Sequence, residues 1–397
     1  MKKQWINAIA ILMGLSAVSV KAQEQKRLEF SGFARVVAGQ FNQENAEYNY
    51  YDDSVTFDEQ SLLALRLDYR LTQTLSLVGQ GIAHFGEGRK SGVQWLYADY
   101  RPNRFLSFKI GKHRTPFFQY SDVLDVGFAY PWITPPTNVY GDSFFNEFTG
   151  ISGRYDFSSS LFSANFEAYR GVFEGAVAVR GQNLNIDVDY VHGGIFSLSS
   201  GNFSLRLAAH EGKVKAVYPE FTPFIQTLEA LAFTESANAL KIDDKPRFMQ
   251  FGLAYETFEY FVRAEYKSTF AKATLIPDTK GAYATIGYNY HSYTIFLTAS
   301  TSRATMKSAR NDIVRGVSLE LDQLSFIFDS IISQLPFDEA DIFSVGARYD
   351  INSGLALKAE VSRINGSEGS RAFFNQQDTT RSKQTGTLVQ VALEWVF

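Results

Sequence analysis

The chain has 397 residues, no cysteine and a formal net charge of −4, from 42 acidic and 38 basic side chains. Nucleic-acid binding favours a clustered basic excess, so this mildly acidic balance gives no reason to expect a nucleic-acid partner. Aromatic residues are abundant, with 35 Phe and 21 Tyr, whereas Pro is scarce, with 10; this composition favours strands joined by tight turns over helices.

The first 22 residues have the pattern of an export signal. Lys2 and Lys3 form a positive start, residues 6–20 are largely apolar, and a cleavage site follows Ala22. The alternative is a membrane-anchor helix, but the apolar stretch is shorter than the roughly 20 residues that such a helix needs. We therefore expect a signal peptide at 1–22 and a mature single-domain chain at 23–397. No later segment has 18 consecutive apolar residues, so a membrane location would require a closed β-barrel.

Beyond this point the sequence repeats an alternation of apolar and polar residues, the period of a β-strand. In 203–211, for example, Phe203 and Leu205 alternate with Ser204 and Arg206. In the eighth segment the alternation breaks around residues 192–194, where we predict a bulge. We predict sixteen strands, most of about ten residues, at 28–41, 60–71, 75–84, 92–101, 105–114, 149–157, 161–170, 185–198, 203–211, 247–256, 259–268, 281–290, 293–302, 341–351, 355–363 and 386–397.

The connections between these segments alternate in length. Short turns at 72–74, 102–104, 158–160, 200–202, 291–292 and 352–354 alternate with longer links, such as those at 42–59, 115–148, 212–246, 303–340 and 364–385. A soluble sandwich also alternates apolar and polar residues, but short turns on one side and long loops on the other are typical of a bacterial outer-membrane barrel. The predicted fold class is all-β, a transmembrane antiparallel up-and-down β-barrel of 16 strands with short periplasmic turns and long extracellular loops.

Aromatic residues cluster beside the short turns on the apolar side of the predicted strands. Rings of this kind settle at a membrane interface, so we expect a periplasmic girdle, although strand propensity alone also enriches aromatics. The residues are Tyr69, Tyr100, Tyr155, Phe157, Phe203, Tyr255, Tyr260, Tyr290, Tyr293, Tyr349 and Phe397.

The chain ends in "LVQVALEWVF", an alternating strand that stops on an aromatic ring. We expect this last strand to close the barrel against the first. The terminal Phe397 resembles the assembly signal of outer-membrane proteins. In strand count, loop order and terminal Phe, the whole mature chain resembles the sixteen-stranded porins of Gram-negative bacteria. The resemblance implies a homotrimer surrounded by outer-membrane lipid and lipopolysaccharide.

The resemblance also implies that the third long loop, 115–148, folds into the lumen and forms a constriction. The loop is aromatic and has no Lys or Arg; an external lid or a trimer contact is the alternative. Its candidate site residues are the acids Asp122, Asp125, Asp142 and Glu147 and the aromatics Phe117, Phe118, Tyr120, Tyr130 and Trp132.

Basic residues on the polar face of the strands form the candidate opposing wall. Facing an acidic loop, they would set a transverse field that tunes ion selectivity; the alternative is that each is solvated and paired with a neighbouring carboxylate. These residues are Arg35, Arg66, Lys109, Arg206, Arg263, Arg348 and Lys358. Loops 212–246 and 303–340 also have apolar residues at helical spacing, which predicts short helices over or inside the mouth of the pore.

The expected function is passive diffusion of small hydrophilic solutes and ions through a water-filled pore, with no cofactor and no metal. A substrate-selective channel for anions such as phosphate, or for sugars, is the alternative. A third possibility, a barrel enzyme, lacks sequence support, because the five histidines form no recognisable catalytic set and no Gly-x-Ser-x-Gly elbow occurs.

Overall fold

The computed structural model describes residues 27–397 except 88, 142–144 and 180–181. The predicted signal peptide, 1–22, lies outside the described residues. Within the described part, no helix is both long and apolar enough to cross a membrane.

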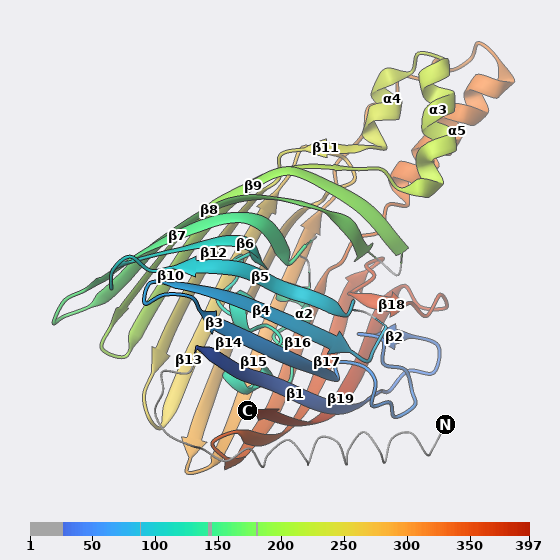
Figure 1. The fold of residues 1–397 in the computed structure, drawn as a ribbon. Helices are drawn as coiled ribbons and strands as arrows, with labels where there is room; N and C mark the ends of the chain where they lie inside the picture. The colour runs from blue at the N-terminus through green and yellow to red at the C-terminus, as the bar shows by residue number, and fades with distance from the viewer. Residues whose placement is uncertain (1–26, 88, 142–144, 180–181) are drawn as a thin grey trace, which may run out of the picture.

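A closed antiparallel β-barrel makes up most of the described chain (Figure 1). Its sheet has seventeen strands in the described residues, of which the short β11 (Ile242–Asp244) continues the pairing of β10 beyond β12, so the wall has sixteen. The wall strands are β1 (Leu28–Phe41), β3 (Leu62–Arg70), β4 (Leu75–His84), β5 (Gly92–Tyr100), β6 (Leu106–Arg114), β7 (Glu147–Ser158), β8 (Ser163–Val179), β9 (Gln182–Ser200), β10 (Phe203–Ala216), β12 (Arg247–Glu256), β13 (Tyr260–Phe270), β14 (Asp278–Tyr290), β15 (Tyr293–Thr305), β16 (Ala340–Asn352), β17 (Leu355–Glu368) and β19 (Lys383–Val396).

The first strand closes the barrel between its neighbours β3 and β19. The pairing of β1 with β19 runs from Phe33 opposite Val396 to Phe41 opposite Leu388. All sixteen predicted segments coincide with wall strands, and β4 and β12 have the predicted bounds. The predicted sixteen-stranded antiparallel barrel is therefore confirmed.

The predicted bulge in β9 is wrong in position. Residues 193 and 194 pair regularly with β10. The register shifts instead at Asp189, which lies opposite no residue of β10, whereas its neighbours Val188 and Tyr190 both do. The alternation fails at Gly193 for another reason. A Cβ atom there would overlap the imidazole of His210 on the neighbouring strand, so the glycine leaves room for an inward-facing ring.

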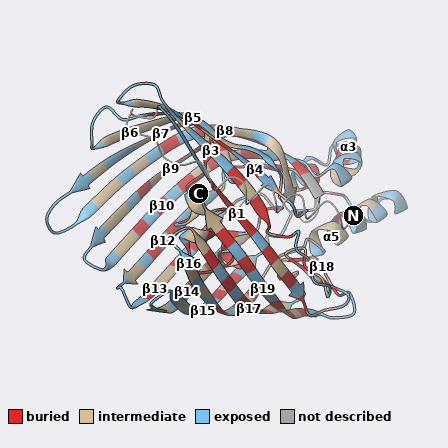
Figure 2. Cartoon of the chain, turned by 60° about the horizontal axis from the view of Figure 1, so that its bottom comes forward, coloured by how far each residue is buried: buried red, intermediate tan, exposed pale blue. Residues whose placement is uncertain are grey.

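Apolar side chains of the wall face outward and polar ones face inward. On β19, Val389 and Val391 are 46% and 44% exposed, whereas Gln390 and Glu394 are 5% and 1% exposed. Figure 2 shows buried and exposed residues alternating along the strands around the barrel. The barrel therefore has an apolar outer surface and a polar interior.

Aromatic rings line the short-turn end of the outer surface. Ten of the eleven predicted girdle residues are exposed outside the barrel, and the eleventh, Tyr255, stacks between Phe203 and Tyr260. The terminal Phe397 continues the pairing of the last strand, because its backbone N–H and C=O bond to Gly32 at 3.0 and 2.8 Å. Its ring lies over Gly32, where a Cβ atom would come within 2.6 Å of it.

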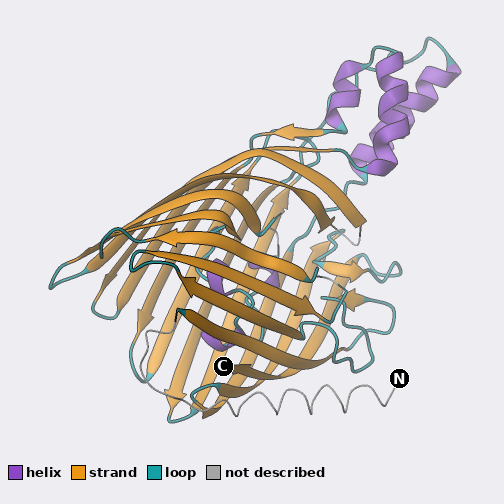
Figure 3. Ribbon diagram, in the orientation of Figure 1, coloured by secondary structure: helices purple, strands orange, loops and turns teal. Residues whose placement is uncertain are grey.

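Two long loops join in a helical knob that projects away from the barrel (Figure 3). We use "knob" for residues 219–240 and 309–335. It contains η4 (Pro219–Phe221), α3 (Thr222–Ala230), α4 (Thr234–Ala239) and α5 (Leu319–Ser333). Its own core includes Ile225, Leu228 and Phe328. The predicted helices thus form, but they lie outside the lumen rather than in it.

Candidate functional site

The third long loop lies inside the barrel, where Figure 3 shows its short helix α2 (Thr137–Tyr140) surrounded by strands. The loop also contains two 3₁₀ turns, η2 (Ser121–Val123) and η3 (Gly127–Ala129). We refer to residues 115–148 as the inner loop. Its aromatic content explains its position, since these rings would be costly to leave in water.

An aromatic cluster attaches the inner loop to the wall. Tyr130 and Trp132 are each 1% exposed. The ring of Trp132 meets the ring of Tyr283 on β14 edge-on at 5.4 Å. The indole N–H of Trp132 donates to Thr298 Oγ1 on β15 at 2.8 Å. Each buried polar group of this contact is therefore paired, which fixes the direction of the ring.

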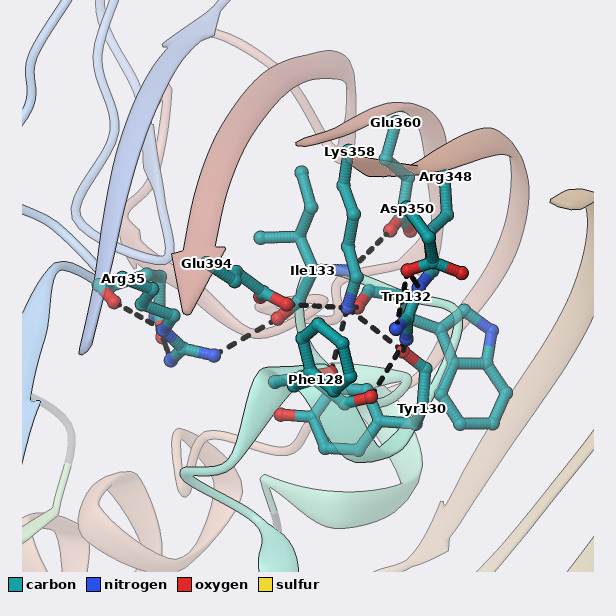
Figure 4. Close-up of polar contacts among 12 residues, drawn as sticks. Arg35, Phe128, Tyr130, Trp132, Ile133, Arg348, Asp350, Lys358, Glu360 and Glu394 are labelled. Atoms are coloured by element: carbon teal, nitrogen blue, oxygen red, sulfur yellow. Dashed lines mark hydrogen bonds and ion pairs between the residues drawn. The ribbon is translucent and has the colours of Figure 1, made fainter. Parts of the chain in front are cut away.

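Lys358 on β17 is the principal polar anchor of the inner loop (Figure 4). Its ammonium group donates to the carbonyl oxygens of Gly127, Tyr130 and Trp132 at 2.7, 2.8 and 2.6 Å. The same nitrogen lies 2.8 Å from the carboxylate of Glu394 on β19. Gly127 has to be a glycine, because a Cβ atom there would overlap this carboxylate. The side chains of Lys358 and Glu394 are 0% and 2% exposed, so the pair is fully removed from water.

Further wall groups bind the backbone on either side of this anchor. Arg35 on β1 donates to Ile133 O at 3.0 Å, and Glu360 on β17 accepts the Ile133 N–H at 3.0 Å. Arg348 on β16 donates to Phe128 O at 2.7 Å, and its guanidinium lies 4.3 Å from the centre of the Phe128 ring. Figure 4 shows these side chains converging on one stretch of the inner loop from three directions.

The start of the inner loop is held by the opposite part of the wall. Arg206 on β10 donates to Pro116 O and Phe117 O at 2.6 and 3.3 Å. Glu265 on β13 accepts the Gln119 N–H at 3.1 Å and also accepts the Tyr140 hydroxyl. The inner loop is thus tied to both sides of the barrel through its own peptide groups.

Asp125 connects the inner loop to the β4–β6 side of the barrel. Its carboxylate is 2% exposed and forms ion pairs with Arg89, at 2.5 Å, and with Arg114. Gln94 donates to the same carboxylate at 2.5 Å. Burial by itself disfavours a charged carboxylate, but the two guanidinium groups outweigh it, so the pKa of Asp125 lies well below its usual value.

The predicted wall bases that bind the inner loop do so through its backbone rather than through its acids, and the transverse field stays a prediction. Among the described residues, none of the seven predicted bases is ion-paired with a predicted acid of the inner loop, and four of the seven, namely Arg35, Arg206, Arg348 and Lys358, bind its carbonyls instead. The physical reason is that an extended loop inside a barrel carries unpaired backbone groups, which need donors more than its side chains do.

The remaining predicted bases have other partners. Arg66 pairs with Asp68 at 2.7 Å, and Arg263 pairs with Glu256 at 2.6 Å while facing the Tyr120 ring. Lys109 lies 5.4 Å from the centre of the Tyr97 ring.

The predicted acids are also dispersed. Asp122 is exposed, and Glu147 belongs to β7, where it pairs with Lys112 at 2.8 Å. Asp142 lies outside the described residues. Of the predicted aromatics, Phe118, Tyr130 and Trp132 are buried in the attachment to the wall, whereas Phe117 and Tyr120 are half-buried.

Sequence reasoning did not identify every group that holds the inner loop. The alternation places Glu265, Glu360 and Glu394 on the inward, polar face of their strands, but it does not show that they bind the inner loop. Arg89 lies in a connection between β4 and β5, where no period applies. Only the folded chain brings it to Asp125.

Comparison with known proteins supports the fold. No family model and no curated protein matches the sequence. Among solved structures, the chain is similar to an anion-selective porin from Comamonas acidovorans, with 12% identity, a TM-score of 0.56 and coverage of 93% of this chain and 99% of that one.

Two further solved structures are similar in the same way. The outer membrane channel DcaP of Acinetobacter baumannii has 11% identity, a TM-score of 0.55 and coverage of 95% and 100%. OmpT, an outer membrane protein of Vibrio cholerae, has 10% identity, a TM-score of 0.56 and coverage of 95% and 100%. The chain therefore has the sixteen-stranded barrel fold of porins.

Proposed function

We propose that this protein is an outer-membrane channel through which small hydrophilic solutes and ions diffuse passively. The observation that carries the proposal is the separation of the two faces of the wall, apolar outside and polar inside. A barrel of this size leaves an aqueous passage unless something fills it. The inner loop narrows that passage and is attached to the wall by its own backbone.

The lumen charges support weak ion selectivity. Near the short-turn end, arginines and aspartates two residues apart on one strand form ion pairs: Arg66 with Asp68, Arg154 with Asp156 and Arg348 with Asp350. The opposite charges within each pair cancel each other's electrostatic field at the distance of a passing ion. The seven predicted bases do not form the ladder of free charges that an anion-selective channel would need, because six of them bind carbonyls or carboxylates of the described residues.

Location and assembly belong to the same proposal. The apolar outer surface with its aromatic band suits the hydrocarbon layer of an outer membrane, with lipopolysaccharide outside it. Export would use the predicted signal peptide. A homotrimer in the outer membrane of a Gram-negative bacterium is proposed from the similarity to porins. The protein is not expected to be an enzyme, and within the described residues no cluster of three metal-binding side chains occurs.

Single-channel recording in a planar bilayer under a salt gradient tests the proposal. We expect stable open steps with a reversal potential close to zero, and heat-denatured protein serves as the control. A silent bilayer with folded protein would contradict the proposed function. A strongly shifted reversal potential would favour the substrate-selective alternative.

A further inference from the structure

A cavity of about 420 Å³ lies on the long-loop side of the inner loop. Its lining includes Tyr50 and Gln60 from the first long loop, Arg89 from the connection between β4 and β5, Tyr140 from the inner loop, and Phe373 and Asn375 from the last long loop. This volume is in the range of small-molecule sites, about 300–1,000 Å³. Several loops that are distant in sequence therefore meet around a space at the entrance to the pore.

Backbone strain is concentrated around this cavity. The described chain has seven non-glycine residues with positive φ, and four of them line the cavity: Asn49, Tyr50, Gln60 and Phe373, at 52°, 64°, 61° and 66°. A fifth, Ala372, is the neighbour of Phe373. Such conformations are energetically unfavourable and gather at functional sites. For bulky rings such as those of Tyr50 and Phe373 they are true outliers.

A small second sheet holds the strained residues in place. β2 (Glu47–Tyr48) pairs with β18 (Phe374–Gln376), which joins the first and last long loops. Beneath it, Tyr48 and Phe374 are 2% and 1% exposed and their rings meet at 5.5 Å. The sheet therefore rests on its own buried aromatic contact, and the cavity is formed without a ligand.

Two hydrogen bonds tie the strained segment to its surroundings. The Tyr50 N–H donates to Asn375 Oδ1 at 2.8 Å, and Asn49 Nδ2 donates to Thr137 Oγ1 of the inner loop at 3.0 Å. The second bond connects the outer wall of the cavity directly to the constriction. A ligand held here would stand in the path of solutes that approach the inner loop.

The chemistry of the lining indicates the class of ligand. The side-chain amides of Asn49, Gln60 and Asn375 each use one end in a hydrogen bond within the protein. Their other ends provide an acceptor at Asn49 and donors at Gln60 and Asn375, which suit hydroxyl groups because a hydroxyl both donates and accepts. The half-buried rings of Tyr50 and Phe373 offer apolar faces beside them. Three guanidinium groups line the cavity, and each has a partner: that of Arg89 pairs with Asp125, and those of Arg35 and Arg371 donate to carbonyl oxygens. The carboxylates of Glu59 and Asp338 lie in the same lining, so charges of both signs surround the space. This arrangement suits an uncharged molecule better than an anion.

We propose that this cavity is a binding site for neutral carbohydrates of mono- or disaccharide size, loaded from the long-loop side before passage. The site rests on the proposed channel function and makes the flux of such solutes saturable. It differs from a row of aromatics inside the pore, because the inner-loop rings Tyr130 and Trp132 are buried against the wall.

Current blockade by sugars tests the site. With maltose added on the long-loop side of a single channel in KCl, we expect brief blockades whose frequency saturates with concentration. Tyr50→Gly and Gln60→Gly remove the contacting side chains while still permitting positive φ, and each should weaken the apparent affinity about tenfold, equivalent to about 1.4 kcal/mol. Ala232→Gly is the matched control, because Ala232 also has positive φ but lies in the knob; it should behave as wild type.

The outcomes separate the site from the channel. A wild-type pore that conducts KCl without maltose blockades overturns the site and leaves the proposed function intact. Variants that bind maltose as wild type does also overturn it, as do blockades by inorganic phosphate in place of maltose. A silent bilayer overturns the proposed function itself.

Discussion

At the scale of single residues, buried cations on the inward face of the barrel bind the backbone of the inner loop. Lys358 alone donates to three carbonyl oxygens and forms an ion pair with the carboxylate of Glu394. Breaking a buried ion pair by removing one partner costs about 3–5 kcal/mol, because the other charge stays buried without compensation. The position of the inner loop therefore depends strongly on this side chain.

Replacing Lys358 by Met tests this dependence. We expect Lys358→Met to lower the free energy of unfolding by about 3–5 kcal/mol and to make the open-channel current noisier, as the inner loop loses its anchor. Denaturant unfolding in detergent micelles and single-channel recording measure the two effects. The matched control is Lys109→Met, since Lys109 is also inward-facing but binds no inner-loop carbonyl. Equal effects of the two substitutions would refute the anchor.

A second residue-scale prediction concerns pH. The folded-state pKa of Asp125 is depressed by Arg89 and Arg114 despite its burial. Its contribution to stability is therefore full above the unfolded value, about 3.9, and is lost only as the pH falls through the lower folded value. We expect the wild-type channel to keep its conductance and noise between pH 7 and about pH 4, whereas Asp125→Asn should be noisy throughout this range. Wild-type recordings that become like those of Asp125→Asn on acidification to pH 4 would contradict the assignment.

At the scale of elements, the knob is a separate packing unit built from two loops. Asp312, from the loop that precedes α5, accepts the N–H groups of Glu235 and Ser236 at 3.1 and 3.0 Å, where α4 begins. Burial opposes the charge of Asp312, but these hydrogen bonds and that of the Ser236 hydroxyl lower its pKa. The carboxylate satisfies backbone donors that a helix start leaves free.

Removing this carboxylate should loosen the knob and leave the barrel unchanged. Loss of an N-terminal cap costs about 0.5–2 kcal/mol of local stability, so Asp312→Ala should accelerate tryptic cleavage at Arg310 and Lys241. Conductance should not change, because the knob lies outside the lumen. Glu220→Ala, at an exposed knob position, is the control and should be cleaved like wild type. A change in conductance with Asp312→Ala would place the knob in the solute path instead.

At the scale of the whole molecule, the two faces of the wall meet different solvents in the proposed channel. Ile110 on β6 is 58% exposed on the outer surface, and its neighbour Lys109 is directed inward towards the Tyr97 ring. The inward face of β6 thus already accommodates the positive charge of Lys109, one residue away from the lipid-facing Ile110. This alternation is what makes the barrel a boundary between lipid and water.

A pair of lysine substitutions on one strand tests the orientation of the wall. Ile110→Lys should lower the free energy of unfolding in lipid vesicles by about 2–4 kcal/mol, as expected for a cation near mid-depth on the lipid face. Ser107→Lys, on the inward face of the same strand, should cost far less. Guanidinium titrations monitored by tryptophan fluorescence measure both. Similar losses for the two variants would show that this strand does not separate lipid from water.

The alternation of apolar and polar residues is enough to predict the barrel, with its sixteen strands, their two faces and its outer aromatic band. Alternation along a strand is a local property, because the face on which a side chain lies does not depend on which strand is its neighbour. The period of two was therefore sufficient to predict the bounds of strands such as β4 and β12. The inward direction of residues such as Arg35 and Lys358 followed from the same period.

The partners of those inward groups could not be predicted, because they depend on contacts that form when the barrel closes. Lys358 is 226 residues from Trp132 and Arg35 is 98 residues from Ile133, and no local pattern links such distant pairs. The same holds for Asp125 with Arg89, for the sheet of β2 and β18, and for the strained cavity that it supports. Closing the barrel brings these groups together, and which donor then meets which acceptor depends on geometry that is set across the whole ring of strands.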